Sequence, residues 1–211
     1  MNRKLVILPL VMAFVAALLG RLPEAFPQNA PSVSAKNFCE VKPGFYRGGK
    51  PSLTDLEKLR GMGVNMIIDF TMANRQAERE KARELGMNYV NIPWDTDTWM
   101  TWFYDYDRVA KKFFELIEDP SNHPVYVHCF SGRDRTGMMV ALYRMEKEGW
   151  SYDEAIAEMK GFGYDEKSYP NLADYLRRAG QDRSRLTSNH SVPLSGGHRL
   201  FQHTVEEKNA R

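Results

Sequence analysis

A cysteine and an arginine separated by five residues, Cys129 and Arg135, are the pair in this 211-residue chain best suited to chemistry. A thiolate is a strong nucleophile, and the planar guanidinium of an arginine can bind two oxygens of a phosphoryl group at once. The spacing therefore predicts a site in which Cys129 attacks phosphorus while Arg135 holds the phosphoryl oxygens. The residues between them are the predicted substrate-binding residues, namely Phe130, Ser131, Gly132, Arg133 and Asp134.

The segments on either side of this stretch indicate the structure that would position it. Residues 125–127 are typical of a short buried strand, and residues 137–145 form an apolar run typical of a helix. The intervening residues would then form a loop that leads into a helix N-terminus. Such a terminus presents unpaired N–H groups and the positive end of the helix dipole, which both favour an anion such as phosphate.

Cys129 is expected to ionise readily in such a loop. The pKa of a free cysteine is about 8.5, and helix N-termini with nearby cations lower it to roughly 3.5 to 7.5. Gly132 would allow the backbone to approach a phosphoryl group closely. We expect Thr136 to donate a hydrogen bond to the Cys129 sulfur, which would stabilise the thiolate as a leaving group. His128 is expected to order the loop rather than to act as a base.

The pattern His-Cys-x5-Arg-Thr-Gly at 128–137 resembles the signature of the cysteine-dependent phosphatases, the superfamily of protein tyrosine and dual-specificity phosphatases. It looks most like the bacterial and atypical dual-specificity branch, with Arg133 in place of a lysine. Residues 45–52 are also similar to a segment of that branch. The resemblance covers roughly residues 38–180, and it implies catalytic roles for Cys129 and Arg135 without any metal or other cofactor.

A phosphatase of this kind needs an acid that protonates the leaving oxygen. Asp95 and Asp97 precede Cys129 by 34 and 32 residues, the range in which the resembling enzymes carry this acid on a separate loop. We favour Asp95, and whichever of the two is not the acid could instead cap the following helix. Asp134 is a third candidate, because a role as acid has been proposed for the loop aspartate of the resembling bacterial branch. The spacing does not decide among the three.

Strands and helices are expected to alternate along the domain predicted at residues 38–180, which indicates an α/β fold. We predict a mostly parallel central sheet of about four to five strands flanked by helices, with the Cys129 loop at the carboxyl ends of the strands. The predicted strands are 44–47, 66–70, 87–92 and 125–127, and the predicted helices are 52–62, 74–85, 105–118, 137–145, 151–160 and 170–178.

One segment departs from the resembling enzymes, which often carry Leu-Arg after the second of these strands. This chain has Phe70-Thr71 there, after Asp69, so the resemblance does not imply an arginine contact from this position, and Arg75 is a candidate substitute. Arg47 would either reach the substrate or brace Asp69, and we favour the bracing role.

The amino terminus is interpreted as a targeting segment. Basic residues precede an uncharged apolar run at 5–19, which is shorter than the roughly 20 residues that span a bilayer comfortably. We therefore expect residues 1–22 to be a signal peptide or a signal anchor, followed by a linker at 23–37. Either would make the protein exported or membrane-anchored, with the catalytic domain on the periplasmic or other extracytoplasmic face.

The remaining segments carry less chemistry. Residues 181–211 are polar without an apolar period and are expected to be a disordered tail. The net charge of +2 and the lack of a basic stripe give no case for a nucleic-acid partner, and the tail histidines lack companions for a metal site. A disulfide between Cys39 and Cys129 would inactivate the site, but Cys39 is more simply explained as a small buried residue.

Three functions are consistent with these sequence features. The first is a phosphatase acting on phosphotyrosine or phosphoserine/threonine in proteins through a phospho-cysteine intermediate. The second is a phosphatase for a phosphoinositide or another phospholipid, which the extra cation of Arg133 and a membrane segment would suit. The third is a non-catalytic, membrane-tethered phosphate-binding module. Such a module could dispense with an acid, whereas this chain retains every catalytic element, so we rank it last.

Overall fold

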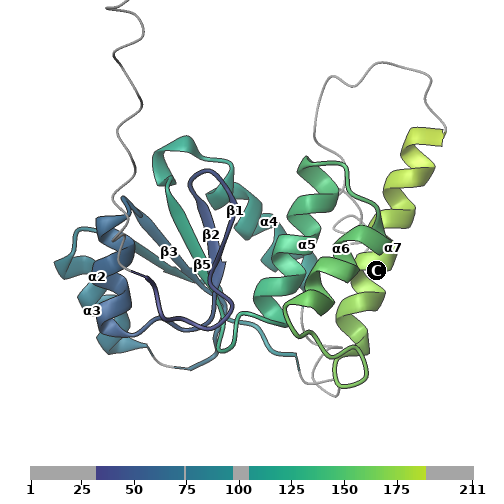
Figure 1. The fold of residues 1–211 in the computed structure, drawn as a ribbon. Coiled ribbons are helices and arrows are strands. Elements are labelled where there is room, and N and C mark those ends of the chain that lie inside the picture. Colours follow the sequence, from purple (N-terminus) through teal and green to yellow (C-terminus); the bar gives the residue numbers. More distant parts are fainter. Residues whose placement is uncertain (1–31, 74, 97–104, 189–211) are drawn as a thin grey trace, which may run out of the picture. The chain divides into compact units, whose positions relative to one another are not determined.

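A five-stranded sheet lies at the centre of the fold, and helices cover both of its faces (Figure 1). The computed structural model describes residues 32–188 except Asn74 and residues 97–104. The strand order is β1-β2-β5-β3-β4, in which β1 runs antiparallel to β2 and the other neighbouring pairs are parallel. The strands are β1 (Cys39–Lys42), β2 (Phe45–Gly48), β3 (Met66–Asp69), β4 (Asn88–Asn91) and β5 (Val125–His128). The prediction of a mostly parallel α/β sheet is confirmed.

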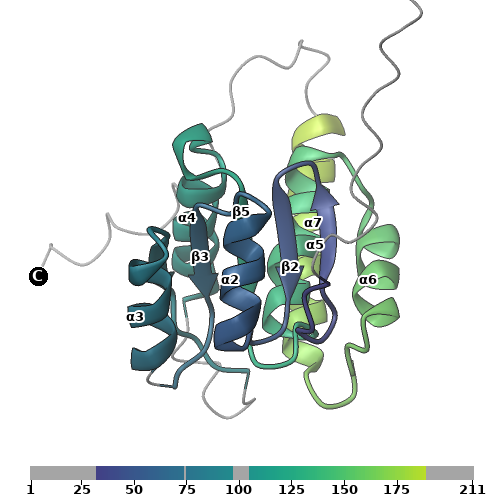
Figure 2. The same cartoon turned by 60° about the vertical axis from the view of Figure 1, so that its left-hand side comes forward.

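The helices form two groups on opposite faces of the sheet (Figures 1 and 2). One group consists of α2 (Leu53–Gly61) and α3 (Gln76–Glu84). The other consists of α4 (Tyr106–Ile117), α5 (Arg135–Lys147), α6 (Tyr152–Gly161) and α7 (Pro170–Ser188), and a short 3-10 helix, η2 (Pro120–Asn122), follows α4.

Each face of the sheet has its own apolar core, because successive side chains of a strand point to opposite faces. Ile67 packs with the smaller cluster under α2 and α3, whereas its neighbour Ile68 packs with the larger cluster under the other helices. Tyr126 and Val127 of β5 divide in the same way. The central strand β5 is buried over its whole length, so the loop that follows it starts from a rigid position.

The start of α2 is held by a carboxylate that also anchors the segment before β1. Ser52 caps the helix and forms a capping box with Asp55. Asp55 Oδ1 additionally accepts a hydrogen bond from the backbone N–H of Ser34 at 2.7 Å. Burial alone would raise the pKa of Asp55, but the hydrogen bonds from Ser34 and Ser52 lower it to about 2. The segment from Val33, part of the expected linker, is therefore packed onto the domain.

The C-terminal helix is longer than the sequence indicated. The sequence predicts that the domain ends at residue 180 and that residues 181–211 are disordered, but α7 continues to Ser188. Polarity alone does not end a helix, because a helix that packing has already nucleated can propagate through polar residues. The rest of the expected tail lies outside the described residues.

The predicted targeting segment, residues 1–22, also lies outside the described residues. Among the helices of the described part of the chain, none is both long and apolar enough to span a membrane.

Candidate active site

The predicted loop joins the end of β5 to the start of α5, as the residue pattern indicated. Cys129 directly follows β5 and is 2% exposed. Gly132 has a φ of +73°, and a Cβ built on it would lie 2.5 Å from the backbone carbon of Gly48. Only glycine fits such a position without strain, since it combines a left-handed backbone with direct contact to another backbone segment. The loop therefore packs tightly against the end of β2.

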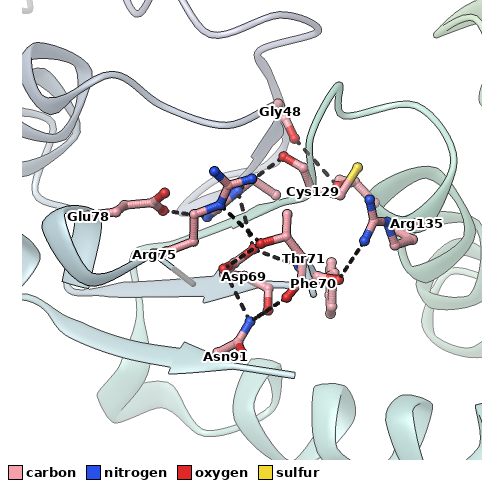
Figure 3. A network of polar contacts seen from close by, with 12 residues as sticks. Gly48, Asp69, Phe70, Thr71, Arg75, Glu78, Asn91, Cys129 and Arg135 are labelled. Carbon is pink, nitrogen blue, oxygen red and sulfur yellow. Dashed lines mark hydrogen bonds and ion pairs between the residues drawn. The ribbon is translucent and has the colours of Figure 1, made fainter. Parts of the chain in front are cut away.

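Arg135 is the first residue of α5, and it links the loop to two other segments, of which Figure 3 labels the one at Phe70. Its Nη1 donates to the backbone carbonyl oxygens of Phe70 and Trp94, both at 3.2 Å. Within the described residues, Nε and Nη2 make no protein hydrogen bond. These two nitrogens lie on one edge of the planar guanidinium, which is the edge that binds a phosphoryl group in a bidentate manner.

His128 is fully buried beneath the loop and belongs to a buried polar network. Its Nδ1 lies 3.2 Å from the carbonyl oxygen of Cys129, and its Nε2 lies 2.8 Å from Oε1 of Glu78 on α3. The ring also stacks on Tyr126, with centroids 5.7 Å apart. These contacts orient the imidazole against the backbone of the loop, as expected for a residue that orders it.

Asp69 lies at the centre of the same network and is fully buried. It accepts hydrogen bonds from the backbone N–H of Thr71 at 2.8 Å, from its hydroxyl at 2.9 Å and from the Tyr89 hydroxyl at 2.8 Å. The Asn91 amide donates to Oδ2 at 3.2 Å and to the Asp69 carbonyl at 2.9 Å. Burial and the charge of Asp69 raise the pKa of Tyr89, so its hydroxyl stays a donor. Arg75 donates to the Thr71 hydroxyl at 3.3 Å and so borders the network.

Arg47 does not brace Asp69, contrary to the expectation. Its strand, β2, neighbours β5 rather than β3, and its Nη2 donates to the carbonyl oxygen of Gly132 at 2.7 Å. The guanidinium lies over the ring of Phe162, with its carbon 3.9 Å from the centroid. Burial lowers the pKa of Arg47 to about 10, so the group remains charged at neutral pH. Arg47 thus supports the loop from beneath.

Thr136 also differs from the expectation. Its hydroxyl lies 3.5 Å from the carbonyl oxygen of Gly48, to which it donates, rather than bonding the Cys129 sulfur. The physical reason is that the loop packs so closely on β2 that the nearest strong acceptor is a backbone carbonyl.

The middle of the loop presents one aromatic side chain and one cation to solvent. Phe130 is 66% exposed, and the Arg133 side chain is 44% exposed. Arg133 Nε donates to the Ser131 hydroxyl at 3.2 Å, and its Nη2 lies 3.7 Å from Asp134 Oδ2. Asp134 itself is mostly buried, and this burial raises the pKa of its carboxyl despite the cations beside it.

Of the two candidate acids upstream, the structure describes only Asp95, since Asp97 lies outside the described residues. Asp95 is half-buried, and its Oδ1 accepts a hydrogen bond from the Thr96 N–H at 2.7 Å. It directly follows Trp94, whose carbonyl oxygen accepts from Arg135. The backbone before Asp95 is therefore joined to the site.

Cys39 and Cys129 are not placed for a disulfide. Cys39 on β1 is paired with Arg47 on β2, which is paired with Val127 on β5, two residues before Cys129. Neighbouring strands lie about 4.8 Å apart and a strand rises about 3.3 Å per residue, so two strand spacings and two residues separate the cysteines by roughly 12 Å. A disulfide requires Cα atoms within about 7 Å. Cys39 is half-buried on the edge strand rather than a core residue.

Sequence reasoning missed most of the buried network. The spacing of Glu78 is one signal that could have been used, because it lies four residues before Ala82 and therefore on the same face of α3. These two are the buried residues of that helix. A carboxylate on the buried face of a helix needs a polar partner. Asn91 is the last residue of a parallel strand, and so is Asp69. The carboxyl ends of such strands meet at one edge of the sheet, so these two polar residues could have been predicted to lie close together.

Comparison with known proteins gives one family and several relatives. The sequence model of the tyrosine phosphatase family matches residues 32–180. The dual specificity protein phosphatase TpbA of Pseudomonas aeruginosa is 28% identical over 152 residues, which cover 71% of this chain and 66% of TpbA. The chain thus aligns with slightly less than two thirds of that relative.

Two solved structures show the same fold. The core catalytic domain of the S. cerevisiae PP-IP phosphatase Siw14, in complex with citrate, matches with a TM-score of 0.60 at 19% identity, covering 75% of this chain and 95% of that one. A cysteine-to-serine variant of P. aeruginosa TpbA in complex with pTyr matches with a TM-score of 0.59 at 24% identity. The match covers 74% of this chain and 91% of that one.

Proposed function

The chain belongs to the tyrosine phosphatase family, and we propose on this basis that it is a cysteine-dependent phosphatase of phosphorylated proteins. The observation that carries the proposal is the placement of Cys129 and Arg135. The buried thiol follows the central strand at the N-terminus of α5, and one edge of the guanidinium beside it makes no protein hydrogen bond within the described residues.

The chemistry follows from these positions. The thiolate sulfur of Cys129 attacks phosphorus while the bond from phosphorus to the ester oxygen breaks, and an acid protonates that oxygen as it leaves. Water then attacks the phospho-cysteine, which releases inorganic phosphate and regenerates the thiolate. Arg135 and the loop N–H groups hold the equatorial oxygens in both steps.

Asp95 is the proposed acid, and Asp134 is its rival. Asp95 is supported by its place next to Trp94, whose carbonyl binds Arg135. Asp134 is supported by its burial, which raises the pKa of its carboxyl, because a higher pKa favours the protonated form that a general acid requires. The pH profile of kcat distinguishes the two candidates. If Asp95 is the acid, the alkaline limb of the profile should flatten in Asp95→Asn and persist in Asp134→Asn. The opposite pattern would assign the role to Asp134.

A protein substrate is the best supported. The pTyr complex is a property of TpbA, and the family match makes phosphotyrosine the first substrate to test in this chain. The phospholipid hypothesis rests on Arg133, which lies half-exposed next to Asp134 and forms an ion pair with it. That ion pair reduces the excess positive charge on which a polyanionic head group would depend.

The test is hydrolysis of an aryl phosphate, a phosphotyrosine peptide and a short-chain phosphoinositide by the wild type and by Cys129→Ser. The wild type should favour the peptide, and Cys129→Ser should lose turnover of all three. Cys39→Ser is the matched control, since it removes the other thiol without touching the loop. Full activity in Cys129→Ser would refute the mechanism, and preference for the phosphoinositide would replace the proposed substrate class.

We also propose that residues 1–22 direct the domain to a membrane or across it, as an anchor or an export signal. The support is the apolar run at 5–19 behind two basic residues. Fractionation of cells that express the full chain, followed by protease treatment of spheroplasts, tests this proposal. Recovery of the full-length protein only in the cytoplasmic fraction would refute it.

A further inference from the structure

Four successive carbonyl groups of the Cys129 loop are each held by a donor from another part of the chain or from the adjoining strand. Their oxygens lie between 2.7 and 3.2 Å from the donor nitrogens. The pairs are Cys129 O with His128 Nδ1, Phe130 O with Lys50 N, Ser131 O with Asn37 Nδ2, and Gly132 O with Arg47 Nη2.

The direction of these carbonyls determines the direction of the next N–H groups. A trans peptide is planar, so the carbonyl of one residue and the N–H of the following residue point in opposite directions. The N–H groups of residues 130–133 therefore point away from the four donors. Within the described residues none of these N–H groups has a protein acceptor. They are free to bind an oxyanion above Cys129, as expected of a loop at a helix N-terminus.

Two of the four donors are side chains from outside the loop and its strand. Asn37 precedes β1, and its amide bridges the carbonyl oxygens of Ser131 at 2.9 Å and Phe162 at 3.1 Å. Its φ of 55° lies in the left-handed region, which asparagine tolerates better than other non-glycine residues. Arg47 lies between the carbonyl of Gly132 and the ring of Phe162. Both side chains thus connect the loop to the turn after α6.

The burial of Arg47 is costly, which suggests a purpose other than stability. Arg47 is 1% exposed, and its Nε and Nη1 have no hydrogen-bond partner among the described residues. Buried polar atoms without partners destabilise a fold. Such a cost is expected where a side chain is retained for a site rather than for packing.

We propose that Asn37 and Arg47 are positioning residues for phosphoryl binding. They hold the peptide planes between Ser131, Gly132 and Arg133, so that the N–H groups of Gly132 and Arg133 face the oxyanion before it arrives. Preorganised donors of this kind stabilise a developing charge without reorganisation. The inference rests on the proposed function, because the oxyanion would be the phosphoryl group of the substrate.

The Asn37 amide is the cleaner site to test. Asn37→Gly keeps the left-handed backbone accessible and removes only the side chain, while Asn37→Asp replaces the donating nitrogen with an oxygen that repels the Ser131 carbonyl. One lost hydrogen bond corresponds to roughly a three- to tenfold change in an equilibrium constant. We expect Asn37→Gly to weaken binding of inorganic phosphate by about this factor, and Asn37→Asp to weaken it further. Isothermal titration calorimetry with inorganic phosphate measures both.

A matched control is available at the opposite edge of the sheet. The amide of Asn65 donates to the backbone carbonyl of His123 at 2.7 Å, before the strands β3 and β5 begin. Asn65→Ala removes the same kind of bond and should lower stability without weakening phosphate binding. Unchanged phosphate affinity in folded Asn37→Gly and Asn37→Asp would overturn the proposal, as would an equal loss in Asn65→Ala.

Arg47 gives a second test. Arg47→Lys keeps the charge and one donor for the Gly132 carbonyl, while Arg47→Met removes both, so phosphate affinity should fall more in Arg47→Met. Equal affinities in the two folded variants and the wild type would contradict the role of Arg47. If neither variant folds, the Asn37 series decides. A wild type that binds phosphate but hydrolyses no ester would refute the proposed function alone, and the positioning role would still be measurable.

Discussion

Replacing Gly132 with alanine tests how tightly the loop packs on β2. The added Cβ would lie 2.5 Å from the backbone carbon of Gly48 and 2.7 Å from the nitrogen of Gly49. Backbone atoms cannot rotate away as a side chain does, so the loop itself must shift. Overpacking of this kind costs about 1–3 kcal/mol. The left-handed backbone, with a φ of +73°, adds about 1–2 kcal/mol for a residue with a Cβ.

Gly86 separates the two costs. It has a φ of +71°, but the nearest atom to its added Cβ is the Arg60 side chain at 4.0 Å. Gly86→Ala should therefore lose only the backbone contribution, about 1–2 kcal/mol of unfolding free energy. Gly132→Ala should lose about 2–5 kcal/mol in total.

Urea denaturation measures the free energy of unfolding, and hydrolysis of an aryl phosphate measures the effect on the site. A displacement of the loop by about 1 Å is enough to lower kcat/KM roughly 100-fold. Gly86→Ala should retain the kcat/KM of the wild type, because it lies between α3 and β4 and away from the loop. If Gly132→Ala matched Gly86→Ala in both stability and kcat/KM, the close contact between the loop and β2 would be refuted.

Three further changes test carboxylates of the fold and of the site. Asp55 has its pKa lowered to about 2, so its contribution to stability is present above the ordinary carboxyl pKa and is lost as the pH falls toward 2. Asp55→Asn should remove up to about 2 kcal/mol at neutral pH and flatten the acid limb of unfolding free energy against pH. Asp134 behaves oppositely, because its raised pKa makes a contribution that is full below the ordinary carboxyl pKa and is lost as the pH rises through the raised value. Asp134→Asn should remove that decline, and urea denaturation across pH 4–8 measures it. Glu78→Ala removes the carboxylate 2.8 Å from the buried His128 Nε2 and should lower the free energy of unfolding by about 1–3 kcal/mol. Glu80→Ala, on the exposed side of α3, should lower it little. Equal losses of unfolding free energy in the two variants would contradict the importance of the contact between Glu78 and His128.

The local features of the site could be predicted from the sequence. The run before Cys129 is β-branched and aromatic, and the run after Arg135 is apolar, so the strand, loop and helix follow from residue types alone. The positive φ of Gly132 matches the role expected for that glycine. Local chemistry was sufficient wherever the interacting residues were close in the sequence.

The contacts between distant segments could not be predicted in this way. The expectation for Arg47 failed because it depended on which strand neighbours β2, and a single sequence does not state the strand order. The Thr136 hydroxyl was assigned to the sulfur because the closeness of Gly48 was unknown. Asn37 was placed in a linker, since nothing in its neighbourhood shows that its amide reaches a loop 94 residues later.

The four carbonyl contacts also have a consequence for protein design. The stretch from Cys129 to Arg135 carries the reactive groups, but its shape is maintained by Arg47 of β2, by Lys50 after β2, by the turn after α6 and by Asn37, which lies two residues before β1. Transplanting this stretch alone into another α/β scaffold would transfer the nucleophile without the geometry. A graft expected to retain the anion site would also have to carry the groups that hold these carbonyls, namely His128, Lys50, Asn37 and Arg47, together with Phe162.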